Sequence, residues 1–342
     1  MKFPFYCFLL LLTFVWACNS SEPPKQITPA FYYWKTVFKL SNDEAQILTD
    51  NHIQKLYVKY FDVDLDERTA KPTFKAVLIP KQKVPQGMSV VPVVYLTNQT
   101  LKWLEPRYLE DFAEKIVDKI EVIHQGWIGE SVGNNEIQID CDWTLSTKKK
   151  YFTLLTILRK KYPHISVTIR LHQVKFSEKT GVPPVERGML MCYNMADWKN
   201  EKTANSIFTP DVLSQYIGEL SEYPLPLDLV MPAFHWTVGY RNHQFQYFLN
   251  AVSSKDFSSI SLFEQDKNRF IAQRDTTLWG IGIRKGDVFR TEEVAYDDLS
   301  KGCRLIKKKI SNQKLTFALY HLDSESLKTY THEQIKELYQ PE

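Results

Sequence analysis

Two aspartates in the stretch NEIQIDCDWT, residues 135–144, have the spacing of a chemical site. Apolar and polar residues alternate up to them, which predicts a β-strand that ends at Asp140 and Asp142. Side chains two positions apart leave a strand on the same face, so both carboxylates point to one side. Packing alone gives no reason for two acids there. Neighbouring carboxylates can supply general acid chemistry, because one of the pair can have a raised pKa.

The elements that would position these acids alternate along the chain. From Pro29 onward, short β-rich runs alternate with segments of helical period, which predicts parallel strands joined by crossover helices. A single (β/α)8 TIM barrel, about 250 residues plus insertions, accounts for the 342-residue length. The alternative is a doubly wound sheet, although no glycine-rich turn follows the first run. The eight predicted strands are AFYYWKTVF, KLYVKYFDVDL, VVPVVYLT, EIQIDCDW, ISVTIRLHQV, GMLMCYNM, LDLVMPAFHW and KLTFALYHLD.

The same pattern sets the expected domain boundaries. Residues 29–342 are predicted to form one barrel domain, and the region of about 240–290 does not fit a single βα unit. We therefore expect an insertion there with its own strands, RFIAQR and TLWGIGI. Ser41 and Glu44 predict a capping box at the first helix. Further helices are expected at about 106–125, in TKKKYFTLLTILRKKYP, and near 209–220, 291–310 and 331–339.

In a barrel, alternate side chains point into the lumen, and sites form at the carboxyl ends of the strands. Asp140 and Asp142 would then face the lumen together with Gln138. Two other strands repeat the pattern: Tyr60, Asp62 and Asp64 share a face, as do Thr168, Arg170 and His172. The alternatives are that Arg170 neutralises one of the aspartates in a buried network, and that Asp62 and Asp64 form an acidic loop edge.

Three motifs resemble those of the family 18 chitinases. IQIDCDWT is similar to the family's fourth-strand signature, which ends in apolar-Asp-x-Asp-x-Glu, and Asp140 and Asp142 match its last two aspartates. MCYN at 191–194 is similar to the sixth-strand Met-x-Tyr-Asp/Asn motif, and LVMPAFHW resembles the apolar-Pro-aromatic seventh strand. The motifs follow the family's order across most of the folded region. The overall pattern also resembles uncharacterised lipoproteins with sugar-hydrolase-like barrels.

The chain departs from that signature at two positions that matter for chemistry. The first aspartate of the motif falls on Ile137 and the catalytic glutamate on Thr144, and the third-strand Ser-x-Gly-Gly is absent. In the family, the glutamate protonates the glycosidic oxygen while the neighbouring aspartate positions the N-acetyl group that acts as nucleophile. Threonine cannot supply that proton. A hydrolase built on this chain needs another general acid, and the candidates are Asp142, Asp62, Asp64 and Asp323.

Aromatic residues cluster at the predicted strand ends, where flat rings suit the apolar face of a sugar. Trp34, Tyr193 and Trp236 are the favoured candidates because each lies within one or two residues of a polar lumen position, while other rings are expected in the core. The predicted catalytic pair is Asp140 and Asp142. The predicted substrate-binding residues are Trp34, Asp62, Tyr95, Arg170, His172, Tyr193, Asn194, His235 and Trp236.

A metal centre is an alternative use of the barrel mouth, the opening at the carboxyl ends of the strands. In a barrel, Asp140, Asp142, His172, His235 and His321 would converge, and carboxylates with imidazoles suit Zn, Mn or Fe. No HxH or HExxH on one element supports this reading, so we predict no metal. With 12 glycines and no phosphate-cradling loop, we expect no nucleotide and no other cofactor.

The N-terminus, MKFPFYCFLLLLTFVWACNSSEPP, is typical of an export signal, with a basic residue before an apolar run too short to span a membrane. Val15-Trp16-Ala17-Cys18 resembles the lipobox of bacterial lipoproteins. This resemblance implies removal of residues 1–17, a lipid on the sulfur of Cys18 and usually an acyl chain, such as palmitate, on its amine. Residues 18–28 would then be a lipidated tether. The alternative is a plain secretory signal with Cys18 free.

Charge and cysteine usage argue against a nucleic-acid-binding protein and against a fold held by disulfides or zinc. The formal net charge is +3, from 43 basic and 40 acidic residues scattered evenly, so no nucleic-acid partner is expected. Besides Cys7 and Cys18, the chain contains Cys141, Cys192 and Cys303, an odd number at wide spacings with no CxxC. Neither a disulfide framework nor a zinc site is therefore expected.

The sequence predicts a membrane-anchored lipoprotein of the cell envelope, at the periplasmic face or the cell surface, whose barrel carries a carbohydrate-directed cleft. The first hypothesis is a glycoside hydrolase acting on a complex glycan. The resemblance to the chitinases implies that this glycan is N-acetylated. The second is a glycan-binding protein that lacks the general acid because Thr144 replaces the glutamate. The third is a metal-dependent hydrolase. The expected partners are a glycan or oligosaccharide and a membrane.

Overall fold

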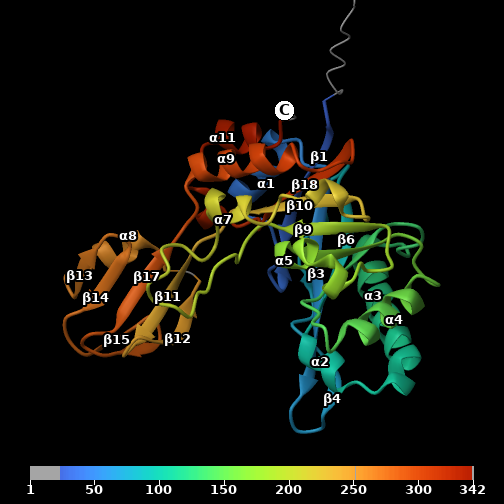
Figure 1. Ribbon diagram of the computed structural model, residues 1–342, viewed down its shortest axis with the longest axis horizontal. Coiled ribbons are helices and arrows are strands. Elements are labelled where there is room, and N and C mark those ends of the chain that lie inside the picture. Colours follow the sequence, from blue (N-terminus) through green and yellow to red (C-terminus); the bar gives the residue numbers. More distant parts are fainter. Residues whose placement is uncertain (1–23, 251, 341–342) are drawn as a thin grey trace, which may run out of the picture.

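The computed structural model describes residues 24–250 and 252–340 of the chain, so the predicted export signal and Cys18 lie outside the described residues. Eight parallel strands form a closed barrel (Figure 1), since β1 pairs with β18 on one side and with β3 on the other. The predicted (β/α)8 barrel is thereby confirmed. Its strands are β1 (Gln26–Tyr33), β3 (Lys55–Asp66), β6 (Ser89–Leu96), β7 (Ile137–Asp140), β8 (Ile165–Arg170), β9 (Arg187–Met191), β10 (Leu227–Pro232) and β18 (Lys314–Tyr320).

Helices cover the outside of the barrel. The longest described helix, α3 (Leu109–Ile128), buries one stripe of side chains that includes Phe112, Ile116 and Ile120, and it ends at Gly129 with φ +94°. Ser41 and Glu44 form the predicted capping box of α1 (Asn42–Asp50). The other helices of the described chain are α2 (Asn98–Trp103), η1 (Pro106–Tyr108), α4 (Lys148–Leu158), α5 (Leu171–Lys175), α6 (Ser177–Thr180), α7 (Pro210–Ser214), η2 (Leu220–Glu222), α9 (Tyr296–Lys307), α10 (Ser324–Leu327) and α11 (His332–Leu338).

The predicted insertion is a five-stranded antiparallel sheet between β10 and α9, and it lies beside the barrel (Figure 1). It has its own apolar core, in which Phe257 packs against Phe270 and Phe289. Its strand order is β12-β11-β17-β14-β13. The elements are β11 (Trp236–Arg241), β12 (Gln244–Leu249), α8 (Ser254–Ser258), β13 (Phe263–Asp266), β14 (Arg269–Ala272), β15 (Thr276–Leu278), β16 (Ile281–Ile283) and β17 (Val288–Glu292).

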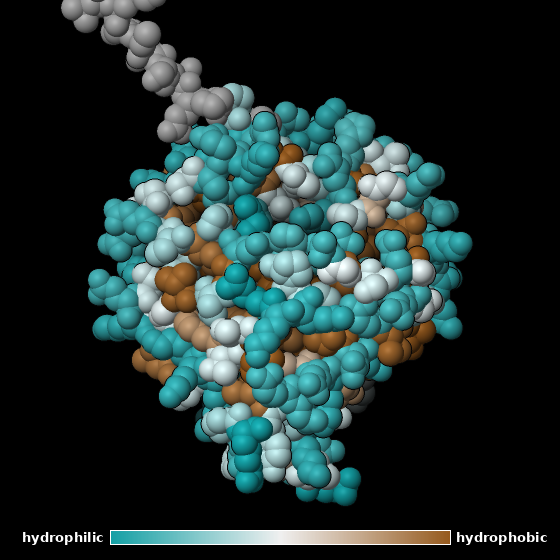
Figure 2. Space-filling view, turned by 90° about the vertical axis from the view of Figure 1, so that its right-hand side faces the viewer, coloured by the Kyte–Doolittle hydropathy of each residue, from teal (hydrophilic) through white to brown (hydrophobic). Residues whose placement is uncertain are grey.

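Three short strands complete the described part of the chain. The strand β4 (Lys71–Lys75) extends the barrel sheet antiparallel to β3, and β2 (Val37–Phe38) pairs with β5 (Ile79–Pro80). No described helix is both long and apolar enough to cross a membrane. Figure 2 shows the side of the molecule that carries α3 and α4. Hydrophilic residues dominate this side, and hydrophobic residues lie in small patches.

Side chains fill the lumen below the mouth. The Tyr32 hydroxyl donates to Gln138 Oε1 at 2.5 Å, and the Tyr32 ring stacks on Tyr57 with centroids 4.9 Å apart. At the amino end of the strands, Arg187 donates from Nε and Nη2 to the buried carboxylate of Asp228, at 2.9 and 2.7 Å. The barrel is therefore a packed core, and its carboxyl end carries the polar groups considered below as a site.

Candidate functional site

Asp140 ends β7 and is almost completely buried, with 6% of its surface exposed. Thr168, on the neighbouring strand β8, donates its hydroxyl to Asp140 Oδ1 at 2.6 Å. Burial and the nearby charge of Asp142 raise the pKa of Asp140 to about 6, against the opposing effects of Thr168 and Arg170. Asp140 can therefore change its protonation state near neutral pH.

Asp142, two residues further on, forms a two-point ion pair with Arg170 at the end of β8. Arg170 Nε donates to Oδ1 at 2.6 Å and Nη2 donates to Oδ2 at 2.7 Å. The Asp142 side chain is still 46% exposed, whereas that of Arg170 is 21% exposed. Of the two aspartates, Arg170 therefore pairs with Asp142, as the alternative interpretation expected. The Asp142 carboxylate is not sealed from solvent, although both of its oxygens accept hydrogen bonds from Arg170.

Thr144 is exposed in the loop after β7, at the position where the family signature has its glutamate. Its hydroxyl lies 2.9 Å from the hydroxyl of Ser146, and its backbone N–H donates to Thr147 Oγ1 at 2.9 Å. Thr147 in turn donates to Asn98 Oδ1 at 2.5 Å. The loop is therefore fixed by hydroxyl groups, and its residue 144 cannot donate a proton as a carboxylic acid can.

The prediction that Tyr60, Asp62 and Asp64 share one face of β3 is wrong for Tyr60. The pairing of β3 with β6 shifts register between Lys59 and Phe61, a bulge that breaks the alternation of side chains. Tyr60 consequently points outward, and its hydroxyl lies 2.7 Å from His124 Nδ1 on α3. Asp64 pairs with Lys75 at 2.8 Å, a contact that lowers the pKa of this carboxyl, so it serves the β3–β4 edge rather than the mouth.

The bulge brings a lysine to the mouth that sequence analysis did not select. Lys59 is 7% exposed, and its Nζ lies 3.1 Å from Asp62 Oδ1 and 5.5 Å from the centre of the Trp34 ring. Side chains that alternate strictly along a strand would place Lys59 and Asp62, three positions apart, on opposite faces. The bulge brings them to the same face, so the role of Lys59 becomes visible only in the structure. Asp62 is thus held by a cation, as Asp142 is.

Aromatic rings line the mouth around a residue absent from the predicted set, Tyr320 at the end of β18. Its ring stacks on the Tyr193 ring with centroids 5.1 Å apart. It also packs against the Trp34 ring in a T-shaped arrangement with centroids 5.5 Å apart. Tyr95 lies 6.4 Å from Trp34, and burial together with the charges of nearby aspartates raises the pKa of Tyr95 to about 12. The structure therefore brings Trp34, Tyr95 and Tyr193 together, and the aromatic end of the strand KLTFALYHLD is the signal that could have added Tyr320.

Trp236 lies outside the barrel lumen, as the first residue of β11 in the inserted sheet. Its Nε1 donates to Glu292 Oε2 at 2.9 Å, and its ring packs on Phe248 with centroids 4.6 Å apart. Phe234 connects it to the mouth, since this ring lies 5.5 Å from Trp236 and 5.8 Å from Tyr193. The aromatic surface thus continues from the mouth onto the insertion.

The remaining predicted residues lie in segments that follow the barrel strands. Asn194 is exposed after β9 with φ +53°, His172 is exposed in the first turn of α5, and His235 is half-buried between β10 and β11. Asp323 accepts hydrogen bonds from Ser326 at the start of α10, so it caps a helix instead of serving as a general acid. No group of three or more His, Cys, Asp or Glu side chains that could hold a metal ion occurs in the described chain.

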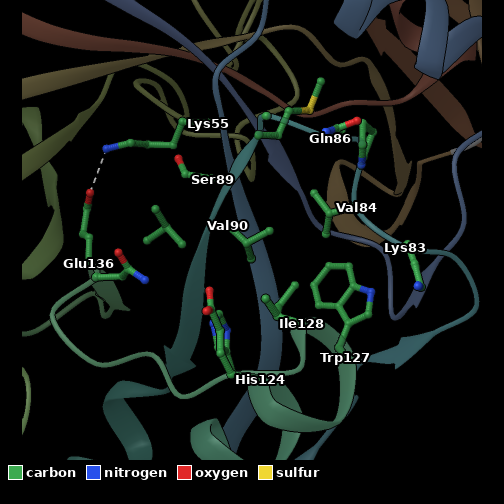
Figure 3. A pocket seen from close by; sticks show the side chains of 16 residues that line it. Lys55, Lys83, Val84, Gln86, Ser89, Val90, His124, Trp127, Ile128 and Glu136 are labelled. Atoms are coloured by element: carbon green, nitrogen blue, oxygen red, sulfur yellow. Dashed lines mark hydrogen bonds and ion pairs between the residues drawn. The ribbon is translucent and has the colours of Figure 1, made fainter.

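A cavity of about 580 Å³ lies at the opposite end of the barrel (Figure 3). Its lining includes Lys55 and Ser89, the first residues of β3 and β6, together with His124, Trp127 and Glu136. Lys55 pairs with Glu136 across it at 2.9 Å. Because sites in this fold form at the carboxyl ends of the strands, the mouth with Asp140 and Asp142 is the candidate site.

The sequence matches no protein-family model, and no curated protein matches it significantly. Solved structures share its fold. The spore cortex-lytic enzyme SleL of Bacillus cereus superposes with a TM-score of 0.54 at 11% identity, over 92% of this chain and 75% of that chain. The C-terminal domain of a possible chitinase from Desulfitobacterium hafniense gives 0.55 at 10% identity, over 93% of this chain and all of the other. These structures therefore share the (β/α)8 barrel fold of this chain.

Proposed function

We propose that this chain is a membrane-anchored protein that binds a complex glycan at the barrel mouth and has lost the general acid of its hydrolase-like fold. One observation carries this proposal: Arg170 binds both oxygens of Asp142 while Thr144 stands where a glutamate would supply the proton. A two-point ion pair orients the carboxylate toward its partner and occupies both of its oxygens. Hydrolysis has no proton donor at the position the family signature provides.

The groups around the pair are suited to a sugar. The ring centroids of Trp34 and Tyr320 lie 5.5 Å apart. Flat amphipathic rings of this kind pack on the apolar faces of pyranoses. Lys59 and Asp62 add a donor and an acceptor next to Trp34. N-acetylated sugars are the first class to test, because the resemblance of Asp140 and Asp142 to the chitinase signature implies them.

The second candidate function is hydrolysis with Asp140 as the acid. The raised pKa of Asp140, about 6, favours it, because a substantial fraction of this carboxyl is protonated at mildly acidic pH. Asp140 is, however, 6% exposed and accepts the Thr168 hydrogen bond through Oδ1, which leaves Oδ2 to carry the proton. Glycan turnover in the wild type decides between the two functions.

The membrane anchor is part of the proposal because Cys18 ends a lipobox-like tetrapeptide. The described chain enters the barrel through β1, whose first residues lie at the amino end of the strands, opposite the mouth. An anchor there leaves the mouth directed away from the membrane surface. That orientation suits a glycan of the cell envelope or of the surrounding medium.

The experiment measures binding and turnover on the same sample. The mature protein is titrated with a chitin hexasaccharide by calorimetry, and the sugar is then analysed for shorter products. We expect binding without cleavage, and about a tenfold or greater loss of affinity in Trp34→Ala, since a stacked ring contributes on the order of 1–2 kcal/mol. Trp127→Phe, at the opposite end of the barrel, is the matched control and keeps the wild-type affinity.

Two results would overturn the binding proposal. Cleavage of the hexasaccharide by the wild type makes the protein a hydrolase, and its loss in Asp140→Asn would assign the acid to Asp140. Unchanged affinity in Trp34→Ala removes the mouth as the binding site.

A further inference from the structure

Three large apolar side chains are exposed on three neighbouring segments at the mouth. Trp103 at the end of α2 is 61% exposed, Leu145 after β7 is 64% exposed, and Phe176 after α5 is 49% exposed. Each segment follows a barrel strand directly, so all three belong to the carboxyl-end face that carries Asp140 and Asp142. We call segments 98–103, 143–150 and 171–180 the rim.

Hydrogen bonds join the rim segments into one surface. Thr147 donates to Asn98 Oδ1 at 2.5 Å, which fixes the second segment to the first. Gln173 Nε2 donates to the carbonyl oxygen of Trp143 at 3.1 Å, and Trp143 Nε1 donates to that of Thr180 at 3.2 Å. The exposed side chains therefore stand on a supported surface rather than on independent loops.

The rim is strongly basic. Its segments contain six lysines and one acid, Glu178. None of the six forms an ion pair with a carboxylate within residues 24–250 and 252–340, although Lys148, Lys150 and Lys175 donate to backbone carbonyls. Three of the lysines occupy the first turn of α4, which contains no acid, and the positive end of the helix dipole adds to their field. The six are Lys102, Lys148, Lys149, Lys150, Lys175 and Lys179.

We propose that the rim extends the glycan site and binds the acidic groups of an anionic glycan chain. This inference rests on the proposed function and assigns its substrate class, a polysaccharide whose sugars carry carboxylate or phosphate groups. Exposed rings interleaved with unpaired cations fit both parts of such a chain, the apolar sugar faces and the charges. A neutral glycan would leave the six ammonium groups without an anionic partner.

An anionic membrane is the other surface that suits lysines beside exposed Trp, Leu and Phe. Two observations favour the glycan. The rim borders the mouth, because Arg170 directly precedes the third segment and Asp142 directly precedes the second. The rim also lies at the end of the barrel opposite the start of β1: β1 begins at the top of Figure 1 and α2 lies at the bottom.

The test compares two probes of equal length, a chitin hexasaccharide and its carboxymethylated form, with the full mature protein at low salt. We expect the wild type to bind the carboxymethylated probe more tightly. The triple variant Lys102→Gln, Lys149→Gln, Lys179→Gln should lose about tenfold in affinity for that probe and keep its affinity for the neutral one, because three weak charge contacts add to roughly that factor. The control triple Lys161→Gln, Lys309→Gln, Lys336→Gln, also exposed, changes neither.

The outcomes separate this inference from the proposed function. Equal affinity of the wild type for both probes, with no effect of the rim triple, overturns the rim proposal and leaves glycan binding at the mouth intact. Absence of binding to either probe overturns both. Binding to phosphatidylglycerol vesicles that the rim triple abolishes, with no preference for the acidic probe, assigns the rim to a membrane and also overturns the proposal.

Discussion

Arg170 donates to both carboxylate oxygens of Asp142, at 2.6 and 2.7 Å, from the end of the neighbouring barrel strand. This pair sets the chemistry of the mouth in two ways. It orients Asp142 by engaging both of its carboxylate oxygens, and the charge of Arg170 counteracts the rise in the pKa of Asp140. The pair and Thr144 together distinguish this mouth from one that protonates a glycosidic oxygen.

The first prediction concerns the recovery of hydrolysis. Thr144→Glu alone restores a carboxylic acid but leaves Asp142 bound to Arg170, and Arg170→Gln alone frees Asp142 without an acid. We expect neither single variant to cleave a chitin hexasaccharide, and we expect the double variant to cleave it measurably, since a positioned general acid contributes about 10²–10⁴-fold in rate. Product analysis by mass spectrometry measures this.

The double variant Thr144→Gln, Arg170→Gln is the matched control, because it differs only in the absence of the acid. Cleavage by this control, or by Thr144→Glu alone, would contradict the role assigned to the ion pair. So would a double variant with Glu that binds the sugar and cleaves nothing.

The second prediction is a pH dependence of stability that comes from Asp140. Its pKa is about 6 in the folded chain against an ordinary value of 3.8, so between these values the folded state holds a proton that the unfolded state has released. The free energy of unfolding therefore falls as pH rises through this range, by up to about 3 kcal/mol. Asp140→Asn removes this loss and keeps the acceptor for Thr168.

Urea unfolding at pH 4, 5, 6 and 7.5 measures the effect as a difference between variant and wild type. We expect the two to be similar at pH 4 and the variant to become progressively more stable toward pH 7.5. Asp211→Asn, whose side chain is 92% exposed, should show no such trend. A constant difference between Asp140→Asn and the wild type across the range would show that Asp140 does not titrate abnormally.

Much of the fold could be predicted because the signals are local. Alternating apolar residues mark each barrel strand, and the spacing of Asp140 and Asp142 fixes their common face through the two-residue period of a strand. Ser41 and Glu44 form their capping box entirely within four residues. These features need no information from distant parts of the chain.

What could not be predicted depends on register and on contacts between strands. The bulge after Lys59 has no sequence signature here, yet it turns Tyr60 outward and brings Lys59 beside Asp62. The partner of Arg170 was open because Asp140 and Asp142 were both available, and only the positions of β7 and β8 select Asp142. Trp236 follows β10 closely in sequence, but the chain crosses there into the inserted sheet.

The third prediction concerns the junction between insertion and barrel. Glu292 is fully buried and accepts hydrogen bonds from Arg290 Nε at 2.5 Å, from the backbone N–H and hydroxyl of Ser206, and from Trp236 Nε1. Glu292→Gln removes the negative charge that pairs with buried Arg290, which keeps only backbone carbonyl partners, and turns one acceptor into a donor. We expect a loss of about 3–5 kcal/mol in the free energy of unfolding.

Urea unfolding followed by tryptophan fluorescence measures this loss, because Trp236 reports the junction directly. Glu293→Gln is the matched control, since Glu293 is the exposed neighbour in the chain and should change stability by less than about 0.5 kcal/mol. Equal stability of the two variants would mean that the Glu292 contacts do not hold the junction together.

The fourth prediction tests the anchor, which lies outside the described residues. Cys18→Ser removes the sulfur that a lipid would modify and, with it, the cleavage that frees the amine for a second acyl chain. We expect the wild type in the membrane fraction and labelled by a palmitate analogue, and the variant unlabelled. The label decides this prediction, because the uncleaved variant keeps the apolar run of residues 3–17. Ser20→Ala, two residues away, should behave as the wild type. Unlabelled wild-type protein would instead identify residues 1–17 as a plain secretory signal, and the proposed glycan site would then have no anchor to the membrane.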